Sequence, residues 1–403
     1  MEGDTLSNLR LSGYGTISYT LDDHDDIAPM RDIRQMPQNP FKTNSTWRLD
    51  SRLAIQADYR FSPEVEFVIQ GALRDRYKPS TKDLLESCYL GLSPAPTIDV
   101  RVGRIGYDAF LMSDIRNAGY TYLWVRPPIE FYGWIPIFHI NGIDAAYNFY
   151  QEDAQWRIKV QRGESGFPIQ MGTDTYDFNG EDLWSVTLLR QDGPFRLKAG
   201  YSQFTSKNEV RLFKSLHQGL EAVAEATSQA FPDISAEALS LRNDIYFGGN
   251  KVTYMTVGAA YDDGTWIAQS EIGRSTATGD VLPNGDMAYF SMGYRIQDFT
   301  PYFTFSTIEP GSDLHKPASD WNAIGQGPFQ SQAIRLINST RMKQYTNTIG
   351  VRWDFSNQLA VKVQLDNTHI YPFGYGLWIR REGESPVSPS DIRLLSFSLD
   401  FVF

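Results

Sequence analysis

Hydrophobic and polar residues alternate along much of the chain in segments of about ten residues. Segment 47–61 shows the pattern well, because Arg48, Asp50 and Arg52 share one parity while Leu49 and Leu53 share the other. Successive side chains of an extended strand point to opposite faces of its sheet. Each segment therefore predicts a β-strand with one polar and one apolar face.

Sixteen such segments can be marked, and the links between them differ in length. The segments are 8–20, 46–61, 64–77, 85–93, 98–105, 139–150, 154–162, 183–191, 194–204, 251–262, 264–274, 286–297, 299–308, 342–355, 357–368 and 391–403. Short turns alternate with long loops at 21–45, 78–84, 106–138, 163–182, 205–250, 275–285, 309–341 and 369–390. Strict alternation of this kind is typical of an up-and-down barrel whose two rims face different environments.

The two faces of the predicted strands indicate what surrounds the barrel. The polar face carries Arg, Asp, Glu and Gln in mid-strand, whereas the other face carries aliphatic residues, with aromatic residues gathered near strand ends. A charged interior and two external aromatic belts are typical of a transmembrane barrel. The sequence thus predicts an all-β fold, a transmembrane up-and-down antiparallel barrel of about 16 strands, with residues 1–403 forming one domain.

Composition excludes several other classes of protein. Lys and Arg total 37 against 48 Asp and Glu in 403 residues, a net charge of −11, which argues against a nucleic-acid partner. Apolar runs fall far short of the roughly 20 residues that a membrane-spanning helix needs. The single cysteine, Cys88, excludes an internal disulfide framework and any multi-cysteine metal or haem site. We expect no cofactor and no metal site.

The chain ends on LSFSLDFVF, residues 395–403, with an apolar or aromatic residue at every second position. This ending resembles the C-terminal signature of bacterial outer-membrane β-barrels, and with the sixteen segments the whole chain resembles a Gram-negative porin of the general trimeric class. The resemblance implies an outer-membrane location, contact with lipid and lipopolysaccharide, and a homotrimer. It also implies periplasmic turns and extracellular loops. Gly13 and Gly15 are then expected near a subunit contact, although they could instead relieve curvature.

The loop 106–138 is unusually aromatic and apolar for a segment in water. The resemblance implies that it folds into the barrel and narrows the channel. Its charged residues are the candidates for the constriction: Asp108, Asp114, Arg116, Arg126 and Glu130. Because both signs are present, the electrostatic sign of this loop stays open.

Strand parity assigns a set of basic residues to the lumen. They are Arg48, Arg52, Arg60, Arg74, Arg76, Arg101, Arg157, Lys159, Arg196, Lys198, Arg295, Arg352 and Lys362. The acids of that face include Asp50, Asp58, Glu64, Glu66, Asp99, Glu271, Asp354 and Asp366. Charged rings select ions by sign, and guanidinium groups suit carboxylates and phosphates. Three outcomes remain open: a balanced wall with little selectivity, a mild preference for anions, and a preference for cations.

Residues 208–231 break the β pattern, with apolar residues at helical spacing, and Ser235 is placed to cap a second short helix from Ala236 to Arg242. We expect a structural lid over the barrel mouth, with partner binding as the alternative. The sequence contains none of the common nucleophile, phosphate-binding or zinc-protease motifs, so we do not expect an enzyme.

The resulting prediction is a porin that passes small hydrophilic solutes and ions by passive diffusion. A substrate-specific channel for small organic anions is the alternative within transport. A barrel enzyme, or a surface receptor acting through loops 205–250 and 309–341, is the alternative of a different class.

Overall fold

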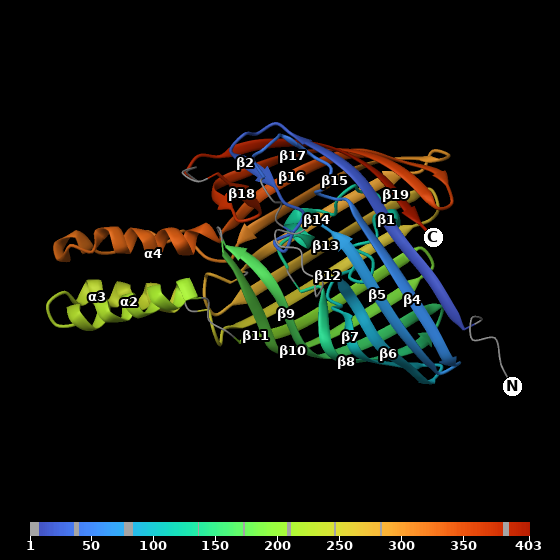
Figure 1. Cartoon of the computed structure of the whole chain (residues 1–403), viewed down its shortest axis with the longest axis horizontal. Helices are drawn as coiled ribbons and strands as arrows, with labels where there is room; N and C mark the ends of the chain where they lie inside the picture. Colours follow the sequence, from blue (N-terminus) through green and yellow to red (C-terminus); the bar gives the residue numbers. More distant parts are fainter. Residues whose placement is uncertain are drawn as a thin grey trace.

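The computed structural model describes residues 8–35, 40–75, 84–135, 137–171, 174–207, 211–245, 247–282, 284–381 and 387–403. One sheet of 17 strands closes into a barrel (Figure 1). One member, β3 (Ser45–Thr46), has only two residues, which leaves 17 − 1 = 16 barrel strands. These are β1 (Leu9–Asp22), β4 (Arg52–Ser62), β5 (Val65–Arg74), β6 (Leu85–Ala95), β7 (Ile98–Gly106), β8 (His139–Gln151), β9 (Ala154–Met171), β10 (Asp174–Asp192), β11 (Phe195–Ser206), β12 (Lys251–Asp262), β13 (Trp266–Ala277), β14 (Gly285–Tyr294), β15 (Phe299–Pro310), β16 (Met342–Ser356), β17 (Leu359–Tyr375) and β19 (Ser390–Val402).

The first strand closes the barrel. It pairs antiparallel with β4 on one side and with β19 on the other, so that Gly15 lies opposite both Leu53 and Phe401. Closure gives backbone groups ladder partners all round, which a strand edge in hydrocarbon would lack. The predicted all-β barrel of sixteen antiparallel strands is confirmed.

Seven short connections lie at one end of the barrel, which we call the turn rim: 63–64, 96–97, 152–153, 193–194, 263–265, 295–298 and 357–358. The start of β1 and the end of β19 lie at the same end (Figure 1). The long connections lie at the opposite end, the loop rim. The predicted alternation of short and long links is therefore correct at the turn rim and requires one correction at the loop rim.

The correction concerns residues 163–182, which we expected to be a loop. Instead, β9 and β10 continue through this region as a long hairpin, with Asp174 opposite Met171. A bulge between Gly180 and Leu183 shifts the register, and Asp182 has a φ of 50° there. The glycines, the proline and the bulge interrupt the alternation of polar and apolar residues, which hid the strands in the sequence.

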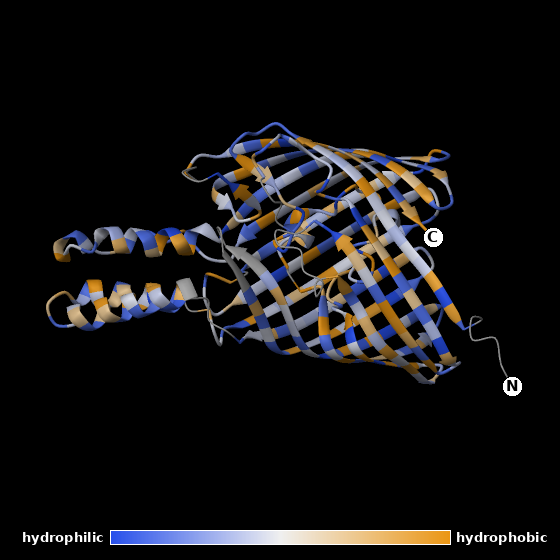
Figure 2. Ribbon diagram, viewed as in Figure 1, coloured by the Kyte–Doolittle hydropathy of each residue, from blue (hydrophilic) through white to orange (hydrophobic). Residues whose placement is uncertain are grey.

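The barrel strands expose large hydrophobic side chains such as Leu11, Ile55 and Ile272, and hydrophobic and hydrophilic residues alternate along the ribbon (Figure 2). Aromatic rings pair on neighbouring or successive positions close to the turn rim. These pairs are Tyr59–Phe61, Phe149–Trp156, Phe195–Tyr261, Trp266–Tyr294 and Phe299–Trp353. Further pairs, Tyr19–Trp47 and Phe305–Tyr345, lie toward the loop rim. The rings are thus gathered at strand ends, where a barrel in a bilayer places its aromatic belts.

Three long helices stand beyond the loop rim: α2 (Arg211–Thr227), α3 (Pro232–Ile245) and α4 (Gly327–Ser339). The buried residues of α2 include Phe213, Leu216 and Leu220, which recur at the spacing of one helix face. The ring of Phe329 on α4 packs so closely on Gly219 that a Cβ there would lie 2.6 Å from it. The two predicted helices are confirmed, but α3 begins at Pro232, so the expectation that Ser235 caps it is wrong, and α4 was missed.

The helices do not form a lid. Figure 1 shows them projecting away from the barrel roughly along its axis, so the expectation that they cover the mouth is wrong. The smaller elements of the loop rim are β2 (Ile27–Pro29), paired with β18 (Trp378–Arg380), and η3 (Trp321–Ile324). Across the described ranges, no helix is long and apolar enough to cross a membrane.

Candidate functional site: the loop-filled lumen

The loop 106–138, which we call the luminal loop, joins β7 to β8 and carries η2 (Gly119–Thr121) and α1 (Ile129–Tyr132). Its large apolar side chains form a core inside the barrel. Phe110, Phe131 and Trp134 are fully buried, and the rings of Phe110 and Phe131 lie 5.7 Å apart between centroids. The loop therefore hides in the lumen the apolar surface that made it unusual as a sequence.

Asp108 fastens the beginning of the loop to two strands of the wall. Its carboxylate forms ion pairs with Lys159 of β9, at 2.7 Å, and with Lys198 of β11. All three side chains are almost completely buried. Two cations thus share one carboxylate, so the three side chains together carry a net positive charge. Hydrogen bonds from the wall and the loop help to satisfy these buried groups.

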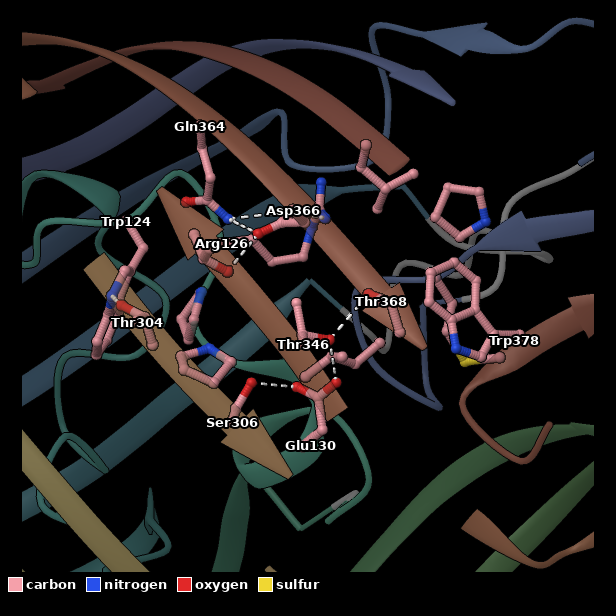
Figure 3. Close-up of a pocket in the computed structure, with 17 residues that line it drawn as sticks. Trp124, Arg126, Glu130, Thr304, Ser306, Thr346, Gln364, Asp366, Thr368 and Trp378 are labelled. Carbon is pink, nitrogen blue, oxygen red and sulfur yellow. Dashed lines mark hydrogen bonds and ion pairs between the residues drawn. The ribbon is translucent and has the colours of Figure 1, made fainter. Parts of the chain in front are cut away.

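Glu130 fastens the end of the loop to the opposite part of the wall (Figure 3). This fully buried carboxylate accepts hydrogen bonds from the Ser306 hydroxyl of β15 at 2.7 Å, and from the Gln344 amide at 2.6 Å and the Thr346 hydroxyl at 2.5 Å, both of β16. The cavity between the loop and these strands measures about 30 Å³, which is room for one or two water molecules and no larger solute. The contact therefore anchors the loop.

The middle of the loop is held by its backbone carbonyl groups, which accept hydrogen bonds from basic side chains of the barrel wall. Lys362 of β17 is fully buried, donates to the carbonyl oxygens of Gly119 at 2.6 Å and Trp124 at 2.8 Å, and pairs with Asp400 at 3.1 Å. Gly119 is required here, because a Cβ would lie 2.1 Å from an Asp400 oxygen. The neighbouring Arg352 of β16 donates to the carbonyl oxygen of Tyr122 at 2.9 Å.

Further contacts reach the remaining side of the barrel. Tyr132 donates to the buried Glu271 of β13, and the indole nitrogen of Trp124 donates to Thr304 of β15 at 2.8 Å. The luminal loop is thus fastened to strands on several sides of the barrel, which narrows the lumen. That it constricts a conducting pore stays a prediction.

Five arginines gather where the luminal loop meets β4 and β5: Arg31, Arg52, Arg74, Arg116 and Arg126, here called the arginine cluster. Asp50, fully buried, accepts from Arg31 at 2.5 Å and from Arg126 at 2.7 Å. Arg74 pairs with Glu86 at 2.8 Å. Within the described ranges, Arg52 donates only to oxygen atoms of uncharged groups, the Asp50 carbonyl at 3.1 Å and the Asn117 side chain at 3.4 Å.

The other predicted wall residues occupy less crowded positions. Arg101 pairs with Asp144 at 2.5 Å, and Arg157 lies 3.7 Å from Asp99. Arg196 lines a cavity of about 440 Å³ between the luminal loop and the turn rim, and Arg60 is exposed near the same rim. Asp114, the third predicted acid of the loop, is exposed.

Two of the residues predicted to line the lumen, Arg48 and Arg76, differ from the others in outcome. Arg48 was placed on a strand, but the chain leaves the ladder between β3 and β4, and Arg48 lies in that segment with a half-exposed side chain 2.7 Å from Asp75. The prediction that it sits on a barrel strand is therefore wrong. Arg76 lies outside the described residues.

Several partners of the site were not singled out from the sequence: Glu86, Asp144, Gln344 and Asp400. Gln344 shares the parity of Arg352 on its strand, so strand parity was an available signal for that residue. Their pairing with a loop distant in sequence had no local signal. The described ranges contain no cluster of three or more His, Cys, Asp and Glu side chains suited to a metal ion.

The chain resembles known proteins in structure and not in sequence. No family model and no curated protein sequence matches the chain. Solved structures do match. The outer membrane channel DcaP of Acinetobacter baumannii aligns with a TM-score of 0.55 at 10% identity, over 100% of this chain and 99% of that one.

Two further structures agree. OmpF of Salmonella typhi, in a complex with daunomycin, gives a TM-score of 0.53 at 12% identity, over 98% of this chain and 97% of that one. An anion-selective porin from Comamonas acidovorans gives 0.51 at 11% identity, over 98% and 99%. The chain therefore has the fold of the Gram-negative outer-membrane porins, as its C-terminal residues and strand pattern predicted.

Proposed function

We propose that this protein is an outer-membrane porin through which small hydrophilic solutes and ions diffuse passively, selected by width and charge and without catalysis. The observation that supports this most is the closed barrel with a polar, charged lumen, an apolar exterior with aromatic belts, and a luminal loop that narrows the interior. In this proposal the turn rim faces the periplasm. The loop rim, with α2, α3 and α4, faces the outside of the cell.

The solute path we propose runs beside β4, β5, β7 and β9, where polar luminal side chains keep contact with solvent. Arg101 and Arg157 have side chains 22% and 35% exposed, whereas Lys159 and Lys198 beneath the luminal loop are at most 8% exposed. Asp114, exposed on the loop, and Gln56 and Gln70, hydrogen-bonded to each other at 2.8 Å, would flank this path.

Selectivity in this proposal is a mild preference for anions. Most luminal cations are matched by a carboxylate, which favours a nearly balanced wall, as the pairs Arg74–Glu86 and Arg101–Asp144 illustrate. The arginine cluster departs from that balance, because Arg52 and Arg116 form no ion pair in the described part of the chain. Guanidinium groups bind carboxylates and phosphates through paired donors, so a specific channel for small organic anions is the alternative that the partly exposed Arg101 and Arg157 favour.

We also propose that the barrel assembles as a homotrimer in contact with lipopolysaccharide, with no nucleic-acid partner. The support is the resemblance of fold, since OmpT of Vibrio cholerae, which aligns with a TM-score of 0.50 at 9% identity over 98% of this chain and 99% of that one, has a structure in trimer form. Cross-linking of intact outer membranes, read as mass on a denaturing gel, tests this assembly.

Conductance across a planar lipid bilayer tests the function. The purified full-length protein should insert in discrete steps of conductance. Under a salt gradient, its reversal potential should show a slightly higher permeability for anions than for cations. A protein that never conducts in correctly folded form contradicts the porin proposal. Saturation of the current by one organic anion would favour the specific channel.

A further inference from the structure

Two buried guanidinium groups of the arginine cluster form no ion pair with a carboxylate of the described residues. Arg52 is 7% exposed and Arg116 6% exposed, yet one terminal nitrogen of each, Nη2 of Arg52 and Nη1 of Arg116, is buried without a hydrogen-bond acceptor. The other donors reach only uncharged oxygens, such as the Ile137 carbonyl 2.7 Å from Arg116. A buried charge of this kind is costly unless it is paired.

Arg116 lines a small cavity, and Arg52 lies beside it. Arg116 and Asn117 line a space of about 20 Å³ together with Arg31, Asp32 and Tyr132. The Asn117 side chain also accepts a hydrogen bond from Arg52, at 3.4 Å, so the second guanidinium group lies next to this cavity. A cavity of this size admits a single small species, such as one water molecule or one monatomic ion. It is too small for a carboxylate-bearing solute.

Two of the neighbouring carboxylates are engaged by other cations, and Asp32 lines the cavity itself. Asp50 is shared between Arg31 and Arg126, and Glu86 pairs with Arg74. Asp32 accepts a hydrogen bond from the Arg34 backbone at 3.0 Å and, within the described ranges, forms no ion pair with Arg116. With Asp366, which lies 3.6 Å from Arg126, five guanidinium groups therefore meet four carboxylates in and around the arginine cluster, a surplus of one positive charge.

The loop fixes Arg116 in place. Its guanidinium carbon lies 3.7 Å from the ring centroid of Phe138 and 5.8 Å from that of Phe110. Stacking on a ring leaves the edge of the guanidinium, where its N–H groups point, available to a further ligand. The unpaired Nη1 lies on that edge.

We propose that this cavity binds one small inorganic monovalent anion of the halide class, held by Arg116 with Arg52 beside it. The anion offsets the positive surplus and joins the luminal loop to the wall at β4. It is a resident ligand and not a solute in transit, so the inference stands whether or not the barrel conducts.

Thermal unfolding of the full-length protein in detergent, followed by tryptophan fluorescence, tests the site. Sodium chloride is compared with sodium gluconate at equal ionic strength, because gluconate is too large for the cavity. Chloride should raise the Tm in a saturable way by about 2–4 °C, since a ligand that binds only the folded state stabilises it. Equal Tm values in both salts at all concentrations would overturn the proposal.

Two variants make the test specific. Arg116→Met should lose the chloride response and, in gluconate, melt no lower than the natural protein, because it removes an uncompensated charge. Arg274→Gln is the matched control. Arg274 is 63% exposed and pairs with Asp286 away from this cavity, so the variant should keep the response. A response that survives Arg116→Met, or that Arg274→Gln abolishes, contradicts the site.

A measurement on the natural protein covers the case in which Arg116→Met fails to fold. Crystals grown in bromide should show an anomalous peak between Arg116 and Asn117. Well-ordered crystals without that peak would refute the proposal. Conductance is not part of either readout, so failure of the porin proposal and failure of this one are distinguishable.

Discussion

Arg52 of β4 and Arg74 of β5 stand directly opposite one another in the antiparallel ladder, and both side chains are buried in the lumen. Like charges in such a pair destabilise a sheet. Glu86 compensates Arg74 at 2.8 Å, whereas Arg52 forms no ion pair in the part of the chain that the structure describes. The pair thus leaves a positive charge beside the luminal loop.

The first prediction follows from this surplus. Replacing Arg52, Arg74 and Arg101 by Gln should move the reversal potential toward cations, because a unit charge at about 4 Å is worth on the order of 1–4 kcal/mol between the dielectric limits of water and a protein surface. The control replaces Arg274, Lys316 and Arg335, three exposed cations outside the lumen, whose fields salt screens within about 10 Å. A larger shift in the control would place the selective region elsewhere.

The second prediction concerns the anchor of the luminal loop. Asp108→Asn leaves Lys159 and Lys198 buried without their carboxylate. Breaking a buried ion pair from one side costs about 3–5 kcal/mol, so the loop should detach there and single-channel conductance should rise. Asp192→Asn, at an exposed pair with Arg190 near the turn rim, is the control. Unchanged conductance in a folded Asp108→Asn protein would show that the anchor does not hold the constriction.

These anchors show what the sequence could and could not predict. Strand parity placed Lys159 and Lys198 on one face, because the two-residue period is local to each strand. Their shared partner, Asp108, lies 51 and 90 positions away in the chain (159 − 108 and 198 − 108), and no local pattern encodes such a pairing. The assignment of the loop to the lumen came from the resemblance to porins.

The errors have physical causes too. Helix α4 begins at Gly327-Pro328 within a segment rich in Gly and Ser, so its short apolar stripe of Ala333, Ile334 and Ile337 did not stand out. The hairpin of β9 and β10 was lost because a bulge at Asp182 resets the alternation. Neither error affects the strand count, because each lies beyond the rim of the barrel proper.

A third prediction concerns pH and the loop rim. His315 lies 2.7 Å from Asp280 and 3.8 Å from Asp244 of α3, and so joins three loop-rim segments. The hydrogen bond to Asp280 raises the pKa of His315, and the negative charges of Asp244 and Asp280 raise this pKa further. Burial of the ring and the positive charge of Arg341 act in the opposite direction. Because the folded pKa exceeds the ordinary 6.5, the contact stabilises the loops fully below about pH 6.5 and is lost as pH rises through the folded value.

The partner sets the lower bound of that window. Hydrogen bonding to His315 lowers the pKa of Asp280 below its ordinary 3.8, so its contribution is present above that value and lost in stronger acid. Limited proteolysis of loop 309–341 should therefore be slower at pH 5.5 than at pH 8.5. His315→Gln should remove the difference, whereas His369→Gln should retain it. Equal cleavage of the natural protein at both values would contradict the contact.

The fourth prediction is the orientation of the barrel in the cell. In a Cys88→Ser background, Ser228→Cys, between α2 and α3, should react with an impermeant maleimide on whole cells. Ser62→Cys, at the end of β4 on the turn rim, should react only after the outer membrane is opened. Reversed labelling would invert the assignment of periplasmic and external ends.

The last prediction separates two roles of Gly15, which lies on the outer face of β1 opposite Phe401. A Cβ at this position would lie 2.2 Å from the Phe401 ring, so the glycine makes room for an aromatic ring within one barrel. Gly15→Ala should therefore destabilise the barrel by about 1–3 kcal/mol, the usual cost of overpacking. Adding Phe401→Ala should recover part of that loss, because residues in contact are not additive.

Urea-dependent unfolding in lipid vesicles measures these changes, with Gly71→Ala as the control, since a Cβ on Gly71 would meet a single atom of the described residues, at 3.6 Å. The same variants distinguish ring packing from a subunit contact. If Gly15 serves only the ring, Gly15→Ala with Phe401→Ala keeps the SDS-resistant oligomer. Loss of the oligomer in both Gly15→Ala and the double variant, with each barrel still folded, would instead place Gly15 at the interface between copies, because close backbone approach there tolerates no added side chain.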